Sequence, residues 1–378
     1  VPWLISGMFA FGPVTWTGEM MKENKWGGCS HEQAANSVYF AANFFGNAAF
    51  GPFADSFGRQ KGMIFSLAVT AFGGSLSITA HTFPVYLMAR TLIGLGNAGV
   101  CLISSVLISE IVSADVRSLV VCFYLQVFYA VGIMLTIPTD YIASNYRTCM
   151  AVPTCLSFLW FNVLLLDLRE SPRYLFAKDH IGKCLVEITN IGLRNGRPLP
   201  ISVTLFENIS SKKDVGRRVY GLLDLWRCTR LRALTGNLCI QWWIVGLQYY
   251  GLTLASSRLP GTVYLNLFLA ATVEIPAYYI AFRVMDVHGR RKVFMACHMT
   301  VMVACISYLL MPGNSTFAAA SRTALAMLGK LGVSGSFGVA YVYGMELFPT
   351  CVRNIGAGIT TQFGNVGGLM APQLLALS

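Results

Sequence analysis

Ten long apolar stretches dominate this sequence and constrain its fold more than any other feature. They cover residues 34–53, 63–80, 84–108, 118–138, 149–167, 233–254, 262–283, 293–311, 318–342 and 355–377. A helix needs about 20 apolar residues to cross the roughly 30 Å hydrocarbon core of a bilayer. Only 12% of the residues are charged, about half of the roughly 25% that is usual in a soluble globular domain. We therefore expect an all-α polytopic membrane protein.

The basic residues lie unevenly between these stretches. Twenty Lys and Arg residues fall in one alternating set of connections, formed by residues 54–62, 109–117, 168–232, 284–292 and 343–354. Only four fall in the other set, and four lie inside the apolar stretches. Because cytoplasmic loops carry an excess of Lys and Arg, the first set is expected in the cytoplasm. The net charge of +11 therefore reflects membrane orientation, and we expect no nucleic-acid partner.

The longest polar segment divides the chain into two sets of five spans. We expect an extracellular loop remnant over residues 1–33, an N-terminal bundle over 34–167, a cytoplasmic linker over 168–232 and a C-terminal bundle over 233–378. Residues 1–25 are apolar but interrupted by Gly and Pro, so part of a first helix is the alternative to a loop there. Within the linker, residues 176–195 have apolar side chains at helical spacing. This pattern predicts an amphipathic helix that lies along the membrane surface.

An internal repeat relates the two halves. The pattern D-x-x-G-R-x-K occurs at residues 55–61 and again at 286–292. A Glu that precedes an Arg by seven residues follows each copy, at 110–117 and at 346–353. Two parallel repeats joined by a cytoplasmic linker are typical of transporters whose halves rock about a substrate site between them.

The repeated loops are expected to form the cytoplasmic gate. Glycine permits the tight turn, and the acidic and basic residues can pair or interact with helix ends. The alternative is that these are ordinary positively charged cytoplasmic loops with no role in gating. The candidate gating residues are Asp55, Gly58, Arg59, Lys61, Glu110, Arg117, Glu170, Arg173, Asp286, Gly289, Arg290, Arg291, Glu346 and Arg353.

Three polar residues are expected deep in the membrane. Glu274 lies 12 residues before Asp286, about 18 Å from the cytoplasmic edge, where a carboxylate is costly unless it faces a partner or a wet cavity. It can be a counter-ion for a cationic substrate or coupling ion, or a structural carboxylate paired to another helix. Asn365 is expected at a similar depth, as a ligand contact or as interhelical glue. Lys330 is expected in the outer third, as a site residue or as the partner of an acidic group.

Aromatic side chains in the same spans can hold an organic cation, because the ring face attracts positive charge. The candidate substrate contacts are Glu274, Asn365, Tyr249, Trp242, Phe337, Gln126 and Lys330. Arg90 is expected either to extend to the membrane surface or to take part in coupling and gating.

Several other chemistries have no support in the sequence. The eleven cysteines contain no C-x-x-C pair, and the five histidines form no metal-binding pattern. The G-x-G-x-x-G match at residues 94–99 lies within an apolar span, where small residues favour close helix packing rather than dinucleotide binding. No nucleophile–base pair or phosphate loop occurs in a polar setting. We expect no enzyme activity, no metal and no cofactor.

Several strings resemble members of the major facilitator superfamily. Residues 51–61 resemble its signature loop, with Ser56 at a position that is usually basic. Residues 169–175 (RESPRYL) resemble an element after the sixth helix of organic ion and sugar transporters. Residues 273–278 (VEIPAY) and 342–356 (VYGMELFPTCVRNIG) are similar to the organic cation/carnitine transporter branch.

The resemblance implies a twelve-helix fold of which ten helices, the second to the eleventh, are visible as spans. It also implies that Glu274 lies near a bound cation and that Tyr249 belongs to an aromatic cage. Family members that prefer cations carry Asp at the position of Asn365, and carnitine and anion transporters carry Arg there. The charge of the substrate therefore stays open.

The expected function is transport of small organic cations or carnitine-like zwitterions by alternating access, in a multi-pass plasma-membrane solute carrier that is monomeric. Coupling to sodium or protons is left open. A sugar or polyol facilitator of the same superfamily is an alternative, since the E-S-P-R and P-T-x-x-R elements are shared. A homologue that acts as a receptor or scaffold and does not transport is another.

Overall fold

The computed structural model describes residues 1–15, 20–21, 26, 28–113, 116, 119–143, 145–196, 224–311, 316–349 and 353–377. All regular elements in this part of the chain are helices. The long ones are α3 (Gly28–Phe57), α4 (Arg59–Ile78), α5 (Phe83–Ile111), α7 (Leu125–Ile142), α8 (Tyr146–Asp167), α13 (Thr229–Ala255), α14 (Val263–His288), α15 (Arg290–Leu310), α16 (Thr316–Leu347) and α17 (Arg353–Leu377). Each expected span therefore overlaps one of these long helices, and the span 118–138 is divided between a short π-helix, η1 (Val120–Tyr124), and α7.

Seven of these helices are long and apolar enough to cross a membrane by length and composition: α4, α5, α7, α8, α14, α15 and α16. The other three, α3, α13 and α17, have 30, 27 and 25 residues and pack among them. Many large apolar side chains stay exposed on the outside of the bundle, for example Phe72, Leu166 and Leu309. An exterior of this kind suits lipid rather than water.

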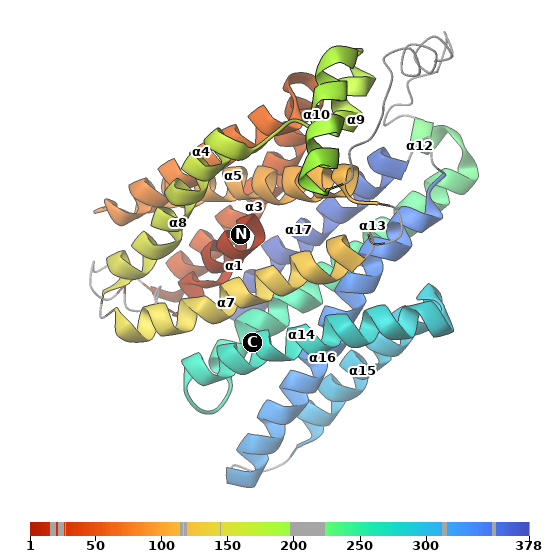
Figure 1. The fold of residues 1–378 in the computed structure, drawn as a ribbon. Coiled ribbons are helices and arrows are strands. Elements are labelled where there is room, and N and C mark those ends of the chain that lie inside the picture. Colours follow the sequence, from red (N-terminus) through yellow and green to blue (C-terminus); the bar gives the residue numbers. More distant parts are fainter. Residues whose placement is uncertain are drawn as a thin grey trace.

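The first half of the chain forms one bundle, drawn from red to yellow in Figure 1. Helices α3, α4 and α5 pack closely on one another, and α8 packs on α4. A short helix, α1 (Pro2–Phe11), lies inside this bundle against α5, α7 and α8. Most of its residues are buried. The expectation of an extracellular loop over residues 1–33 is therefore wrong for residues 2–11, whose apolar side chains form an inner helix.

The glycines of the G-x-G-x-x-G match explain how α5 approaches its neighbours. A Cβ atom on Gly94 would meet the backbone of Tyr39 on α3, and one on Gly96 would meet Ser66 and Thr70 on α4. Small residues therefore let these helices touch through their backbones. The interpretation of this motif as helix packing is confirmed.

The second half forms a similar bundle from α13 to α17, drawn from green to blue in Figure 1. α13 packs on α17, and α16 packs on both α14 and α15. The two bundles meet where α3 packs on α17 and where α7 packs on α14. This is the arrangement that two parallel repeats predict.

The segment between the bundles carries short helices at one end of the molecule. These are α9 (Pro172–Ala177), α10 (Ile181–Arg194) and α12 (Asp224–Arg227). Helix α10 is strongly amphipathic, as expected over 176–195. The Leu193 side chain, however, is 60% exposed, whereas the Cys184 side chain is buried. We call this the linker end of the molecule, and the opposite end the outer end.

Candidate functional site

A buried ion pair lies in the middle of the C-terminal bundle. The Glu274 carboxylate on α14 accepts the Lys330 ammonium of α16 at 2.8 Å, and the two side chains are 0% and 2% exposed. Each residue lies near the middle of its helix, at positions 12 of 26 and 15 of 32. Glu274 therefore does not face lipid, and Lys330 is its partner. An ion pair in this setting is neutral as a unit, and removing one member would leave a buried charge at a cost of about 3–5 kcal/mol.

Two tyrosines complete the hydrogen bonding of the carboxylate. The Tyr249 hydroxyl of α13 lies 3.0 and 2.9 Å from the two Glu274 oxygens, and the Tyr278 hydroxyl donates to Oε2 at 3.2 Å. The Lys330 ammonium also donates to the hydroxyl of Thr253. Tyr249 and Thr253 are one helical turn apart on α13, so a single face of that helix serves both charges. Sequence reasoning missed Tyr278 and Thr253.

The Lys330 ammonium also lies on an aromatic face. Its Nζ is 3.6 Å from the centroid of the Tyr249 ring. The Tyr249 ring packs on Phe337 at 4.9 Å between centroids, and Trp242 packs on Phe337 at 5.5 Å. The predicted residues Glu274, Lys330, Tyr249, Trp242 and Phe337 are thus brought together by three helices. An ammonium between a carboxylate and a ring face is the arrangement that organic cations require.

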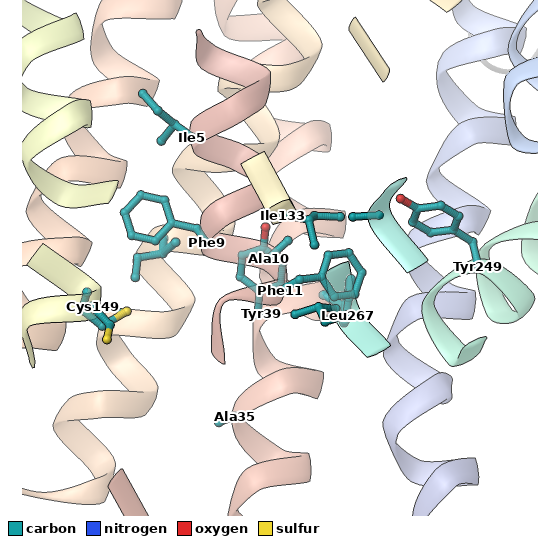
Figure 2. Packing of buried hydrophobic residues seen from close by; sticks show 14 of the residues in the cluster. Ile5, Phe9, Ala10, Phe11, Ala35, Tyr39, Ile133, Cys149, Tyr249 and Leu267 are labelled. Atoms are coloured by element: carbon teal, nitrogen blue, oxygen red, sulfur yellow. The ribbon is translucent and has the colours of Figure 1, made fainter. Parts of the chain in front are cut away.

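The cluster extends across the interface between the bundles. Phe11 of α1 lies 6.4 Å from Tyr249 and 6.0 Å from Tyr250, and Phe40 of α3 lies 4.5 Å from Tyr250, between ring centroids. Figure 2 shows this buried cluster running from Ile5 and Phe9 of α1 to Tyr249 of α13. Aromatic side chains from both halves therefore pack next to the candidate site.

The N-terminal bundle buries a charge of its own. Arg90 of α5 is 0% exposed, so it does not extend to the membrane surface. Its Nη1 donates to the Phe9 carbonyl at 2.9 Å, and its guanidinium lies 4.6 Å from the centroid of the Tyr39 ring. Asn97 donates to the Tyr39 hydroxyl at 2.7 Å. Among the described residues, no carboxylate forms an ion pair with Arg90.

Two predicted substrate contacts lie apart from this cluster. Asn365 of α17 is half-buried, and its amide donates to Gln362 one turn earlier at 3.2 Å. This contact lies within one helix and joins Asn365 neither to Glu274 nor to Lys330. Gln126 is buried on α7, in the N-terminal bundle. A substrate role for either residue stays a prediction.

The first copy of the repeated turn lies at the linker end and carries a dense charge network. Gly58 has φ +107°, a conformation that favours glycine. Arg59 pairs with Asp55 at 2.8 Å and with Glu110 at 3.2 Å. The Glu170 carboxylate accepts the backbone N–H of Arg59 at 2.9 Å and that of Gln60 at 3.3 Å. Glu170 therefore caps the start of α4 from a position more than a hundred residues away.

The second copy is simpler. Gly289 has φ +82°, so glycine serves the same purpose there. Arg290 holds Glu346 through two contacts of 2.8 Å, from Nε to Oε2 and from Nη2 to Oε1. The side chains of Arg290 and Glu346 are 34% and 47% exposed. A Cβ on Gly289 would meet nothing within 4 Å.

The other gating candidates make fewer contacts. Lys61, Arg173, Asp286 and Arg291 are exposed, and none of them forms an ion pair with another residue of the described part of the chain. Arg291 lines a cavity of 440 Å³ with Asn237, Gln241, His298 and Tyr343 among its neighbours. Arg117 lies outside the described residues, and for Arg353 only the helical backbone is described.

Comparison with known proteins identifies the family of this chain. The model of the sugar (and other) transporter family matches residues 5–376. The chain belongs to this family. It is 31% identical over 362 residues to solute carrier family 22 member 15 of Xenopus tropicalis, covering 93% of this chain and 66% of that protein. It is 28% identical to organic cation/carnitine transporter 2 of Homo sapiens, covering 90% of this chain and 60% of that protein.

Solved structures share the fold of this chain. The proton:xylose symporter XylE bound to 6-bromo-6-deoxy-D-glucose matches with a TM-score of 0.72 at 16% identity, covering 100% of this chain and 87% of XylE. An inward-open XylE from E. coli matches with a TM-score of 0.72 at 15% identity, covering 99% of this chain and 87% of XylE. The expected major facilitator fold is confirmed, and the long apolar helices agree with a multi-pass membrane protein of the family named above. It spans about two thirds of the length of the relatives named above.

Proposed function

We propose that this chain forms the core of a transporter that moves small organic cations or zwitterions across the plasma membrane by alternating access. One observation carries the proposal: the Glu274 carboxylate is buried midway along α14, beside a cluster of aromatic rings to which both bundles contribute. The Lys330 ammonium already lies between that carboxylate and the Tyr249 ring. A substrate ammonium would use the same carboxylate and the same ring face.

A zwitterion matches the ion pair because it carries one positive and one negative charge. Its ammonium would contact Glu274, and its carboxylate would contact Lys330, so the two buried charges would each keep a partner. A cation uses only Glu274 and has to replace Lys330. The name of the human relative includes both cations and carnitine, which supports testing both classes.

Alternating access is supported by the contacts between the bundles. Gln373 of α17 donates to the Ser37 hydroxyl of α3 at 2.9 Å, and Ser37 donates to the Leu369 carbonyl at 3.4 Å. Both contacts lie near the start of α3, at the outer end. They would have to break for the outer end to open, while the network around Arg59 lies within one bundle and can move with it.

The linker end is proposed to face the cytoplasm, from the excess of basic residues in its connections. Cys228, just before α13, provides a test because the backbone N–H groups of Leu231 and Arg230 lower the pKa of its thiol. At neutral pH a larger share of the thiol is ionised and reactive. An impermeant maleimide should label Cys228 only after cells are permeabilised, and Cys228→Ser should remove that label. Labelling of Cys228 in intact cells would reverse the proposed orientation.

A sugar facilitator is less well supported by the site. Gln241, a polar side chain suited to a sugar hydroxyl, is half-buried and donates a hydrogen bond to Asn237 at 2.6 Å rather than to the Glu274 cluster. An ion pair is also a poor match for an uncharged ligand, because the desolvated charges gain no opposite charge from it.

Uptake by the full-length protein in cells separates these functions. Radiolabelled tetraethylammonium, carnitine and glucose should be compared at equal concentration, with untransfected cells as the control. We expect saturable uptake of at least one of the first two and none of glucose. Glucose uptake alone would overturn the cation and zwitterion proposal, and uptake of none would favour a receptor or scaffold.

A further inference from the structure

The ion pair of Glu274 and Lys330 has a consequence for the ion that drives transport. We propose that Lys330 couples transport to protons: a cation that binds Glu274 displaces Lys330, which releases one proton for each cation that crosses. This inference rests on the proposed function and names its coupling ion.

Among the described residues, Lys330 has no second acidic partner. Its ammonium contacts the Glu274 carboxylate at 2.8 Å, the Thr253 hydroxyl and the Tyr249 ring face. Within the described part of the chain, Glu274 is the only residue that forms an ion pair with it. Once a substrate cation is bound to Glu274, a protonated Lys330 would remain buried in contact with only the Thr253 hydroxyl and the Tyr249 ring. An uncompensated ammonium in such surroundings favours loss of the proton over retention.

The other titratable groups around the pair cannot take over the charge of Glu274. On α13 and α14 they are the hydroxyls of Tyr249 and Tyr278, both of which contact the carboxylate. Tyr250 of α13 and Tyr129 of α7 lie within electrostatic range of Glu274. All four are phenols, which are uncharged at neutral pH and bring no negative charge to Lys330.

The exchange balances in charge and in atoms. Before binding, the site holds one carboxylate and one ammonium. On binding, one N–H bond of Lys330 breaks, its electron pair stays on the nitrogen, and the proton passes to water on the side from which the cation entered. The loaded site then holds the carboxylate, the cation and a neutral amine that can accept a hydrogen bond from Thr253. On the far side the cation leaves and Lys330 takes a proton from that side.

The site is therefore neutral in both of the states that cross the membrane. Cation transport becomes an electroneutral one-for-one antiport with protons. A zwitterion behaves differently, because its carboxylate pairs with the protonated Lys330 and no proton needs to leave. One site would then couple cations to a pH gradient and leave zwitterions uncoupled.

The test uses the full-length transporter reconstituted in liposomes with an acidic lumen. Radiolabelled tetraethylammonium should accumulate about tenfold for each unit of pH difference, the limit for one-for-one exchange, and a membrane potential set with potassium and valinomycin should not change this. Carnitine should equilibrate without accumulating. Tetraethylammonium uptake that does not depend on the pH gradient would overturn the inference but not the proposed function. Absence of uptake for every probe would defeat both.

Two substitutions identify Lys330 as the group responsible. Lys330→Arg keeps a positive charge beside Glu274 but does not release a proton, so pH-driven accumulation should be lost. Lys330→Gln removes the titrating group, so tetraethylammonium uptake should respond to membrane potential instead. Accumulation that survives in Lys330→Arg would overturn the assignment. If neither variant folds, the pH and potential dependence of the wild type still decides whether the exchange exists.

Discussion

The two copies of the D-x-x-G-R-x-K turn have the same backbone and different surroundings. Both glycines have positive φ, at +107° for Gly58 and +82° for Gly289. Around the first turn, Arg59 pairs with two carboxylates and Glu170 caps the start of α4. At the second turn, Arg290 forms one two-contact pair with Glu346, and no carboxylate among the described residues accepts the first backbone N–H groups of α15 as Glu170 does for α4.

This difference separates the features that the repeated sequence determines from those that depend on the surrounding segments. The glycine and the arginine set the turn and its first ion pair in both bundles. The rest of the network depends on the segment after α8, in which Glu170 accepts the backbone N–H of Arg59 and Tyr174 donates to the Ser56 carbonyl. The bundles also differ in their buried charges: in the described part of the chain, the C-terminal bundle pairs Glu274 with Lys330, whereas Arg90 of the N-terminal bundle forms no ion pair with a carboxylate.

Removal of Glu170 should have the largest effect among changes at the turns. Glu170→Ala deletes a carboxylate that accepts backbone N–H groups of Arg59, Gln60 and Ser171. Losing a charged cap of this kind costs about 1–3 kcal/mol. We expect the melting temperature to fall by several degrees and uptake to fall about tenfold. Glu187→Ala, which breaks an exposed pair of 3.5 Å with Arg169, is the matched control and should change little.

A glycine pair tests whether the crowding at the first turn is real. Gly58→Ala and Gly289→Ala both place a side chain at positive φ with ψ of 154° and 156°, a backbone region that is essentially restricted to glycine, which costs about 1–3 kcal/mol. Only at Gly58 would the new Cβ also meet the Glu170 carboxylate and the Tyr174 ring. Thermal unfolding should therefore show a greater loss for Gly58→Ala. Equal losses, or a difference that persists when Glu170→Ala is added to both, would contradict this account.

The smallest effect is expected at the second turn. Glu346→Gln breaks an ion pair whose members are both partly exposed, and such pairs contribute about 0–1 kcal/mol. We expect the maximal uptake rate to change by less than about threefold, with the half-saturating concentration unchanged. A loss as great as that of Glu170→Ala would show that the two turns contribute equally.

Much of the fold could be predicted because apolar length and charge asymmetry are local properties of the sequence. The sequence does not decide between a loop and a helix over residues 1–25, since α1 has only ten residues and lies next to Gly12 and Pro13. Glu274 was found from its depth in a span, whereas its pairing with Lys330 depends on how α14 and α16 pack. Tyr278 could have been found, because it lies four residues after Glu274 and so on the same helix face. The capping of α4 by Glu170 has no local signal.

The most direct measurement compares two carboxylates on one substrate. In the full-length protein, Glu274→Gln and Glu346→Gln each remove a single negative charge, one at mid-membrane and one at the linker end. With equal surface expression, the first should abolish saturable uptake of tetraethylammonium or raise its half-saturating concentration by at least about tenfold, and the second should leave that concentration unchanged. Unaltered affinity in Glu274→Gln would mean that the carboxylate serves only to hold Lys330, and that the substrate binds elsewhere.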